Sequence, residues 1–503
     1  MTTDPERPSY LDTLLRQHLH HLLGDTDAEA TTLLLQQLQW LPLPGGATLM
    51  TQGDAGDAMY LLVSGRLRAL ITDAEGKTRA VRDVTRGQVV GEMSLHTNAP
   101  RSATMVAVRD SVRVRLGKPE FQRVLGLSAT LSVALTRTII ERLQTESRAA
   151  ASERPVAMAL LPVTAGVDTP GFARRLVAAM GAYGRIALVD AAALDTAAGM
   201  PGLAQAAMDD VAAGQRIGAT LDGIEALHDH VLLVGDDTAG AWSQRCRRHS
   251  DELLLLADAD QPPQVHANER PRPAADAAPW CPAEVLVLLH PEKRQCPRRT
   301  RDWLARRPVA DHVHIRPALD RDMARLARLQ TRHAVGLVFA GGGARGLAHL
   351  GVWQALTEQG VDVDVVGGTS IGAIMAAPVA ADQTLAQVLP ITRRAFLRKP
   401  TSDFNFLPLM SLIKGMRMRR VVRDATQELL GAEADLEDLW KGCFAIASSY
   451  SNACEKLLRD GPLQQTLLAS AAIPGALPPV IREGELLCDG GTFNNFPVDV
   501  MRG

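Results

Sequence analysis

The stretch VDVDVVGGTSIGAIMAAPVA, at residues 361–380, decides the fold of the C-terminal part of the chain. Its first half is rich in β-branched residues and predicts a buried strand, whereas the small and apolar residues after the turn predict a helix. Ser370 lies between the two in the pattern Gly-x-Ser-x-Gly, which Gly368 and Gly372 complete. This pattern is typical of a nucleophilic serine on a sharp turn, but a small residue in a tight corner also satisfies it.

A glycine loop precedes this turn, in AVGLVFAGGGARGLAHLGVWQALTEQG at residues 334–360. The order of strand, loop and helix fits a dinucleotide-binding fingerprint, but such a site needs an acidic residue at the end of the second strand. Asp362 and Asp364 precede the second strand instead. A dinucleotide site would also leave the Ser370 turn unexplained.

The alternative interpretation uses both turns together. Glycines carry no Cβ, so the backbone amides of Gly341, Gly342 and Gly343 can point into one cavity at a helix N-terminus, where the helix dipole favours negative charge. Amides placed in this way form an oxyanion hole beside a nucleophile. A loop that serves only the packing of the helix against the strand is the third interpretation.

A nucleophilic serine needs a base, and the order of residues excludes the common one. α/β-Hydrolases supply a histidine after the serine. Here the last of the 13 histidines is His349, so none follows Ser370. Asp489, in LLCDGGTFNNFP, ends an apolar strand and precedes two glycines. Its carboxylate can take the serine proton if it is partly desolvated, or it can simply cap its own Asp-Gly turn.

Four segments, GGGARGLAHLGV, GGTSIGAIMA, ASAAIPGALPPV and DGGTFNNFPVDV, together resemble the patatin-like phospholipase family. The resemblance covers residues 335–500 and implies a serine hydrolase with a Ser–Asp dyad. His349 belongs to the family pattern without a catalytic role. The site residues that the resemblance implies are the nucleophile Ser370, the acid/base Asp489, and an oxyanion hole formed by the amides of Gly341, Gly342 and Gly343 with Arg345 nearby.

The N-terminal part has a different texture. Residues 43–116 contain short alternating runs separated by Gly and Asp, which predict a small β jelly roll, and residues 118–150 predict helices. The segment GEMSLHTNAPRSATMVA looks like the phosphate-binding cassette of cyclic nucleotide-binding domains. Glu92 can accept from a ribose 2′-hydroxyl, and Arg101 can pair with the cyclic phosphate.

Amides near Gly91 and the hydroxyl of Ser102 can complete this cradle. We therefore predict a cyclic nucleotide, cAMP or cGMP, as a regulatory ligand. The alternative is a barrel that has lost its ligand and serves only as a scaffold.

Five continuous apolar runs lie between residues 155 and 330, and helical segments separate them. Runs of this kind are typical of buried parallel strands and predict an α/β domain. The segment PVTAGVDTPG lies where a phosphate loop would lie, but it lacks the Gly-Lys-Ser/Thr that grips a phosphate. We find no catalytic motif in this domain and interpret it as a structural or interaction module. The runs are VAMALLPV, RIALVDA, HVLLVGD, DELLLLAD and AEVLVLLH.

The predicted fold is therefore multidomain. We expect a β jelly roll with flanking helices at 1–150, an α/β domain at 155–330, and an α/β patatin-like hydrolase domain at 333–503. This order resembles the neuropathy target esterase type of lysophospholipase. The sequence ends 14 residues after Asp489, where we expect at least one more strand.

The composition limits the partners. The chain has 503 residues, 46% hydrophobic and 22% charged, and its net charge of −2 gives no general attraction to nucleic acid. Six scattered cysteines form no CxxC pair and indicate a reduced, cytoplasmic protein without a structural metal. No apolar run is long enough to span a bilayer.

Residues 391–423 hold nine Lys or Arg and one acidic residue, interleaved with apolar groups. They form either a lid or surface helix that contacts anionic lipid, or a core-packed helix with a solvated basic face.

We therefore expect a serine esterase that cleaves acyl esters of phospholipids or lysophospholipids, requires no cofactor, and contacts the inner face of the membrane peripherally. Two alternatives belong to other classes. One is a nucleotide-sensing binding protein with an inactive hydrolase domain. The other is a transcription regulator, which the strand-rich segment 150–330 disfavours because it shows no helix-turn-helix.

Overall fold

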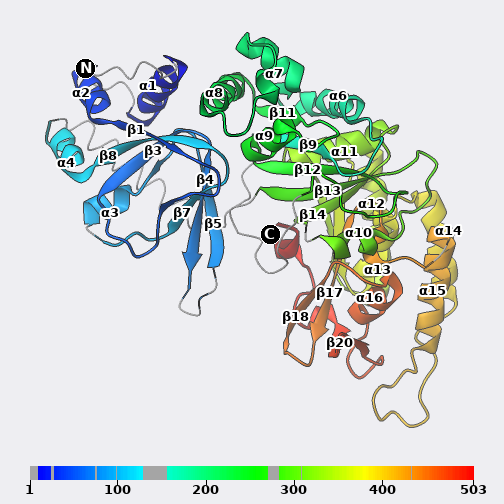
Figure 1. Cartoon of the computed structure of the whole chain (residues 1–503). Helices are drawn as coiled ribbons and strands as arrows, with labels where there is room; N and C mark the ends of the chain where they lie inside the picture. The colour runs from blue at the N-terminus through cyan, green and yellow to red at the C-terminus, as the bar shows by residue number, and fades with distance from the viewer. Residues whose placement is uncertain are drawn as a thin grey trace. The chain divides into compact units, whose positions relative to one another are not determined.

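The structure is a computed structural model that forms two compact units, Met1–Leu256 with Val265–Val285, and Ala257–Gln264 with Leu286–Gly503 (Figure 1). The end of the helical segment predicted at 118–150 lies outside the described residues. Among the described residues, no helix is long and apolar enough to cross a membrane. The structure describes residues 9–502 apart from 24–27, 74–75, 77, 98, 128–155, 270–281, 308 and 432.

The first unit begins with two four-stranded antiparallel sheets, ordered β1-β8-β3-β6 and β2-β7-β4-β5. Leu61 and Phe121 belong to one apolar cluster and Leu67 and Val84 to another. The predicted jelly roll is therefore confirmed. Its elements are α1 (Ser9–Leu23), α2 (Ala28–Gln37), β1 (Gln39–Leu43), β2 (Thr48–Met50), β3 (Ala58–Ser64), β4 (Arg66–Thr72), β5 (Thr78–Thr85), β6 (Val89–Val90), α3 (Glu92–Thr97), β7 (Thr104–Ala107), β8 (Ser111–Gly117) and α4 (Lys118–Leu127).

The same unit continues with four parallel strands in the order β10-β11-β9-β12. These strands coincide with four of the five apolar runs, so the prediction of a parallel α/β arrangement is confirmed. Three of the helices begin at aspartates (Asp168, Asp190 and Asp210) whose carboxylates accept from a backbone amide three residues on. The elements are β9 (Ala157–Pro162), α6 (Thr169–Met180), β10 (Ile186–Val189), α7 (Ala191–Ala198), α8 (Val211–Leu227), β11 (His230–Val234), α9 (Ala241–His249) and β12 (Glu252–Asp258).

A buried charge cluster joins the jelly roll to this α/β part within the first unit. Arg109, which precedes β8, donates to both carboxylate oxygens of Glu225 near the end of α8. Its Nε also lies 3.3 Å from Asp251, which in turn accepts from Arg66 at 3.0 Å. All four side chains are buried. Such a cluster ties two sequence-distant parts together, because removing one partner leaves charge buried without compensation.

The second unit contains β13 (Ala283–Leu289), with its neighbour β14, and then the sheet that carries the Ser370 turn. That sheet has the order β15-β16-β17-β20-β19, and β18 also pairs with β17. Strands β15, β16 and β17 are parallel, whereas β18 and β20 run antiparallel to β17. The sequence predicted β13, β15, β16, β17 and β20, but it did not predict β14, β18 or β19. β14 and β18 carry polar residues inside the strand, and β19 has only three residues.

Helices α13 and α16 pack on this sheet, whereas α12, α14 and α15 pack on other helices of the unit (Figure 1). Their apolar side chains belong to one core cluster that includes Trp353, Val366 and Leu467. One prediction is corrected here. The helix after the glycine loop does not begin at the loop, because a 3₁₀ turn at Gly343–Leu347 intervenes. The elements are α10 (Thr300–Arg306), β14 (Asp311–Ile315), α11 (Asp320–Gln330), β15 (Gly336–Phe339), α12 (Ala348–Glu358), β16 (Val365–Thr369), α13 (Ile371–Ala380), α14 (Leu385–Leu397), α15 (Met416–Leu430), β17 (Gly442–Ser449), β18 (Cys454–Leu458), α16 (Leu463–Ser470), β19 (Val480–Arg482), β20 (Glu485–Asp489) and α17 (Val498–Arg502).

The buried cluster yields a stability prediction. Arg109→Ala should destabilise the first unit by about 3–5 kcal/mol, because Glu225 and Asp251 lose a buried cationic partner. Arg185→Ala is the control, since it removes an ion pair whose two side chains are 69% and 49% exposed, and it should leave the unfolding transition unchanged. Scanning calorimetry of the full chain, with hydrogen exchange of jelly-roll peptides, measures both variants. Equal transitions for the two would contradict the role given to Arg109.

Candidate active site

Ser370 lies on a strained turn between β16 and α13. Its backbone has φ 57° and ψ −124°, a conformation that residues with a Cβ rarely adopt. The sequence produces this turn because both flanking glycines stand against backbone. A Cβ on Gly372 would lie 2.2 Å from the carbonyl oxygen of Phe339, and one on Gly368 would lie 2.5 Å from the same atom. The helix therefore approaches β15 closely only with glycine at these two positions.

The Ser370 side chain is bonded to Asp489. Its Oγ donates to Asp489 Oδ2 at 2.6 Å, and both residues are buried. Asp489 ends β20, so the hydroxyl and the carboxylate come from strands of one sheet, separated by β17. The other carboxylate oxygen accepts from the Gly491 amide at 2.8 Å. The two interpretations of Asp489 are thus compatible, because one oxygen caps the turn while the other meets the serine.

The Asp489 carboxylate is set up as a stronger base than an exposed aspartate. Burial raises the pKa of the Asp489 carboxyl above its ordinary value, and the hydrogen bonds from Ser370 and Gly491 only partly oppose this. A raised pKa increases the affinity of the carboxylate for a proton. The arrangement can therefore accept the proton of Ser370 when its oxygen attacks a carbonyl.

The glycine loop runs beside the serine. A Cβ on Gly341 would lie 3.3 Å from the Cβ of Ser370. The Gly341 amide, however, donates to the carbonyl of Asn495 at 3.0 Å, which takes it out of the predicted set of oxyanion donors. The amides of Gly342 and Gly343 make no hydrogen bond to another described residue. Gly343 has φ 56°, which favours glycine, so Gly342 and Gly343 are the candidate donors.

Two other residues of the loop region, Arg345 and His349, make no hydrogen bond to Ser370 within the described part of the chain. Arg345 belongs to the 3₁₀ turn and its side chain is exposed. The ring of His349 is bonded through Nε2 to the carbonyl of Ala340 at 2.8 Å and stacks on Phe339. His349 therefore holds the glycine loop against α12 and does not contact Ser370.

Sequence reasoning missed two residues of the site. Ser470 accepts from the amide of Ser370 at 2.9 Å and donates to the carbonyl of Ile446 at 2.6 Å. The side-chain amide of Asn495 donates to the carbonyl of Gly341 at 3.4 Å, while the backbone carbonyl of Asn495 accepts from the Gly341 amide. Both residues lie inside segments that carried the resemblance, but a single Ser or Asn in such a segment gives no signal of its own.

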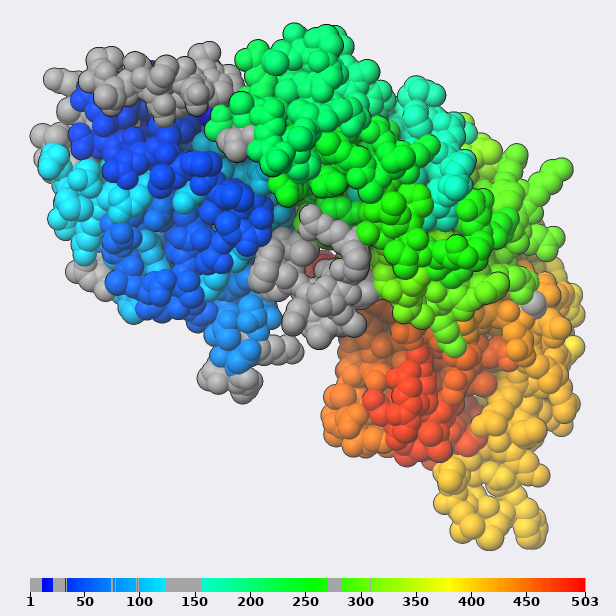
Figure 2. Space-filling model, in the orientation of Figure 1, coloured from blue at the N-terminus to red at the C-terminus, as the bar shows by residue number. Residues whose placement is uncertain are grey.

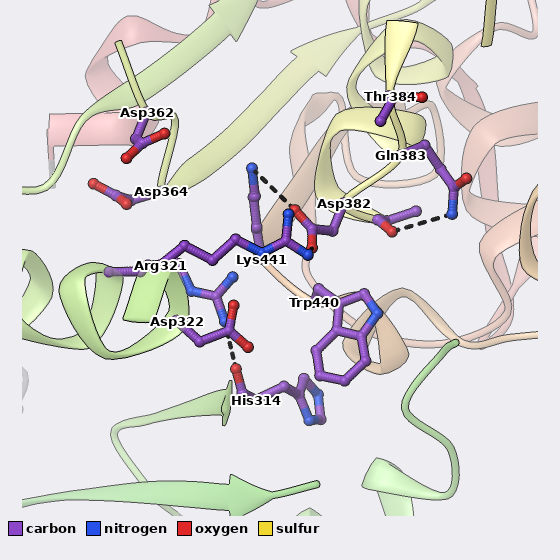
Figure 3. A network of polar contacts seen from close by, with 12 residues as sticks. His314, Arg321, Asp322, Asp362, Asp364, Asp382, Gln383, Thr384, Trp440 and Lys441 are labelled. Atoms are coloured by element: carbon purple, nitrogen blue, oxygen red, sulfur yellow. Dashed lines mark hydrogen bonds and ion pairs between the residues drawn. The ribbon is translucent and has the colours of Figure 1, made fainter. Parts of the chain in front are cut away.

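An ionic network fixes both ends of the strand–turn–helix that carries Ser370. Before β16, Asp364 is 1% exposed and accepts three hydrogen bonds from Arg328 of α11, at 3.2, 2.9 and 2.7 Å. After α13, Asp382 accepts from Arg316 at 2.7 Å and from Arg321 at 2.8 Å. Figure 3 shows Asp362 and Asp364 on one side of this network and Asp382 beside Lys441 on the other. Residues 316–328, which precede β15, therefore fix the start of the strand before Ser370 and the end of the helix after it.

The predicted nucleotide site is partly assembled in the jelly roll. Arg101 is buried and donates to the carbonyls of Gly91 at 2.9 Å and Ala58 at 2.7 Å. Glu92 is buried at the start of α3, next to Gly91, whose φ of 82° suits glycine. Ser102 is exposed. The structure therefore brings Gly91, Glu92 and Arg101 together and leaves the hydroxyl of Ser102 at the surface.

Comparison with known families assigns three domains. Residues 40–127 match the cyclic nucleotide-binding domain, residues 156–336 match the neuropathy target esterase family P-loop like domain, and residues 337–502 match the patatin-like phospholipase family. In the middle domain, the Asp168 carboxylate caps α6 and accepts from Gly171 at 2.9 Å. An anion already occupies the helix end that a phosphate loop offers to phosphate.

Several curated proteins are similar to the chain along most of its length. Patatin-like phospholipase domain-containing protein 7 of Rattus norvegicus is 30% identical over 92% of this chain and 37% of its own length. Neuropathy target esterase sws of Drosophila melanogaster is 29% identical over 92% of this chain and 35% of its own length. Patatin-like phospholipase domain-containing protein 6 of Mus musculus is 29% identical with the same coverage as the rat protein. The chain thus spans about a third of these relatives.

The ionic network yields a prediction about Ser370. Arg328→Met removes the three hydrogen bonds to Asp364. The freed end of β16 should slow the reaction of Ser370 with a fluorophosphonate by about 10- to 100-fold, as a small displacement of a reacting group does. Arg328→Lys should recover part of the rate. The control Arg299→Met removes an exposed pair with Asp302. A rate equal to that of the wild type in folded Arg328→Met would show that this contact does not position the serine.

Proposed function

Because residues 337–502 form a patatin-like phospholipase domain, we propose that the chain is a serine esterase that hydrolyses acyl esters of phospholipids or lysophospholipids. The observation that carries the proposal is the 2.6 Å hydrogen bond from Ser370 Oγ to Asp489 Oδ2 on a strained turn. A buried hydroxyl bonded to a buried carboxylate of raised pKa is what a two-residue acyl-transfer mechanism requires.

In the acylation step, Ser370 Oγ attacks the ester carbonyl while Asp489 Oδ2 takes the hydroxyl proton. The carbonyl oxygen becomes an oxyanion, which the amides of Gly342 and Gly343 stabilise by donating to it. The C–O bond to the glycerol oxygen then breaks, and Asp489 returns its proton to that oxygen. The products of this half-reaction are an acyl-Ser370 ester and the deacylated alcohol.

In the deacylation step, Asp489 takes a proton from water, and the resulting hydroxide attacks the acyl-Ser370 carbonyl. The same two amides hold the second oxyanion. Collapse releases the fatty acid, and Asp489 gives the proton back to Ser370 Oγ. Each proton taken is returned, so the dyad ends the cycle as it began.

The chain also carries a cyclic nucleotide-binding domain, at residues 40–127. As part of the same proposal, cAMP or cGMP binds there as a regulatory ligand, with its phosphate on Arg101 and its ribose on Glu92. The buried guanidinium of Arg101 supports this, because a buried cation beside the turn at Gly91 can pair with the negative charge of a cyclic phosphate. The proposed setting is the cytoplasm, at the inner face of the membrane, where lipid substrate and nucleotide meet.

The first prediction concerns turnover. Ser370→Ala should reduce fatty acid release from lysophosphatidylcholine to background, and Asp489→Asn should reduce it by at least about 100-fold, since Asn cannot accept the proton. Arg299→Met is the control and should keep full activity, because it removes only an exposed pair with Asp302. Full activity in either dyad variant would sink the proposal and favour a binding protein with an inactive hydrolase domain.

The second prediction concerns pH. Only ionised Asp489 can act as the base. The rate of hydrolysis of a short-chain ester should therefore be maximal above the raised pKa of Asp489, and it should fall as the pH drops through that pKa. The midpoint should lie above about 3.9, the ordinary value for an aspartate. Initial rates at constant ionic strength measure it. A rate that rises as the pH falls would contradict the assignment of Asp489.

The third prediction concerns the nucleotide. Arg101→Leu should weaken binding of cAMP or cGMP by at least about 30-fold, because it removes a buried charged partner of the phosphate. Arg79→Leu, a change at an exposed arginine of β5, is the control. Isothermal titration calorimetry measures both. If the wild type binds neither nucleotide, the jelly roll is a scaffold, and the regulatory part of the proposal fails while the esterase part stands.

A further inference from the structure

The loop between α14 and α15 exposes a contiguous group of apolar side chains. Figure 2 shows this segment extending beyond the rest of the second unit at the lower edge of the view. A group this exposed is uncommon on a soluble protein and marks a surface that something else covers. We call it the apolar tip: Phe404 (67% exposed), Phe406 (102%), Leu407 (68%), Leu409 (87%), Met410 (72%) and Leu412 (57%).

The loop forms a hairpin that is closed by backbone hydrogen bonds. Phe404 and Ile413 form an antiparallel bridge, the Asn405 amide donates to the Leu412 carbonyl at 2.9 Å, and the Lys414 amide donates to the Asp403 carbonyl at 2.7 Å. The side-chain amide of Asn405 also donates to the Ser411 carbonyl at 2.8 Å. The backbone at the base of the hairpin is therefore satisfied internally, while the apolar side chains face outward.

Exposed cationic side chains lie in the chain segments that flank the hairpin. Lys399, Lys414, Arg419 and Arg420 are exposed, and none makes an ion pair with another residue in the described part of the chain. Three other arginines of this region are paired, Arg394 with Glu428 and both Arg398 and Arg423 with Asp424. An apolar apex flanked by unpaired cations suits a bilayer surface, in which phosphates lie outside the acyl chains.

The hairpin is bonded to the segment that supports the nucleophile. The Leu412 amide donates to the Gly475 carbonyl at 2.8 Å, and the Ile413 amide donates to the Ala476 carbonyl at 2.9 Å. These residues closely follow Ser470, whose hydroxyl accepts from the Ser370 amide at 2.9 Å. A membrane held at the tip would therefore lie beside the segment that leads to the candidate active site.

We propose that the apolar tip inserts into the surface of an anionic phospholipid bilayer, with the flanking cations on its phosphates, and thereby brings the Ser370 site to its lipid substrate. The proposal rests on the proposed function for its preference for lipid over a protein partner. It also resolves the two interpretations of residues 391–423. Both helices pack through a buried face, at Val388 and Val422 for example, and the connecting loop contacts lipid.

The test measures binding apart from turnover, with Ser370→Ala as the parent protein so that no lipid is consumed. The parent protein should co-sediment with vesicles of phosphatidylcholine that contain about a third of phosphatidylglycerol. A smaller fraction of it should co-sediment with vesicles of pure phosphatidylcholine. Phe406→Ser/Leu409→Ser should lower the partition coefficient by more than about tenfold, because two large apolar groups no longer leave water. The charge variant Lys414→Glu/Arg419→Glu should abolish the preference for the anionic vesicles.

Leu227→Ser is the matched control, since Leu227 is 66% exposed on α8 and distant in sequence from the tip; it should bind as the parent does. In the Ser370 background, Phe406→Ser/Leu409→Ser should still hydrolyse a soluble short-chain ester at the wild-type rate, which shows that the variant is folded and active. Failure of that ester assay in the wild type would defeat the proposed function instead. Vesicle binding that the tip variant retains would overturn the docking proposal, as would a dimer of the parent that the tip variant abolishes.

Discussion

The second unit is organised around one short contact, the 2.6 Å hydrogen bond from Ser370 Oγ to Asp489 Oδ2. It is costly to build, because a buried carboxylate loses hydration and a non-glycine residue at φ 57° costs about 1–3 kcal/mol. Neighbouring groups hold it in place: Ser470 accepts from the Ser370 amide, and Gly491 donates to the second Asp489 oxygen. The same contact requires Gly368 and Gly372, because only glycine at these positions lets α13 approach the end of β15.

This contact also explains features far from the serine. A strained turn keeps its geometry only if the strand before it and the helix after it stay fixed, and Arg328 and Arg316 provide this by binding Asp364 and Asp382 at the two ends. Because the dyad is buried, an ester must leave water to reach it. The exposed apolar tip suits a substrate that arrives from a lipid surface. Ile473 is also exposed, and it lies close in sequence to Gly475 and Ala476, which accept hydrogen bonds from the hairpin.

Much of this was predictable from the sequence because it depends on local patterns. The Gly-x-Ser-x-Gly turn, the glycine loop and the Asp-Gly-Gly turn can each be recognised from a few neighbouring residues. Tertiary contacts leave no such mark. The Gly341 amide is engaged by Asn495, 154 positions later, and Arg328 finds Asp364 only after folding. Strands β14, β18 and β19 have no clear sequence pattern and can be recognised only from their pairing with neighbouring strands. The domain boundaries at about 150 and 330 and the chemical roles of the site residues stay predictions.

The most direct test of the central claim is intact-mass measurement of the full chain after treatment with a fluorophosphonate. If Asp489 activates Ser370, the wild type should gain the mass of one phosphonyl group, Ser370→Ala should gain none, and Asp489→Asn should react far more slowly. An adduct that persists in Ser370→Ala, or a wild type that stays unlabelled while folded, would contradict an activated serine at this turn.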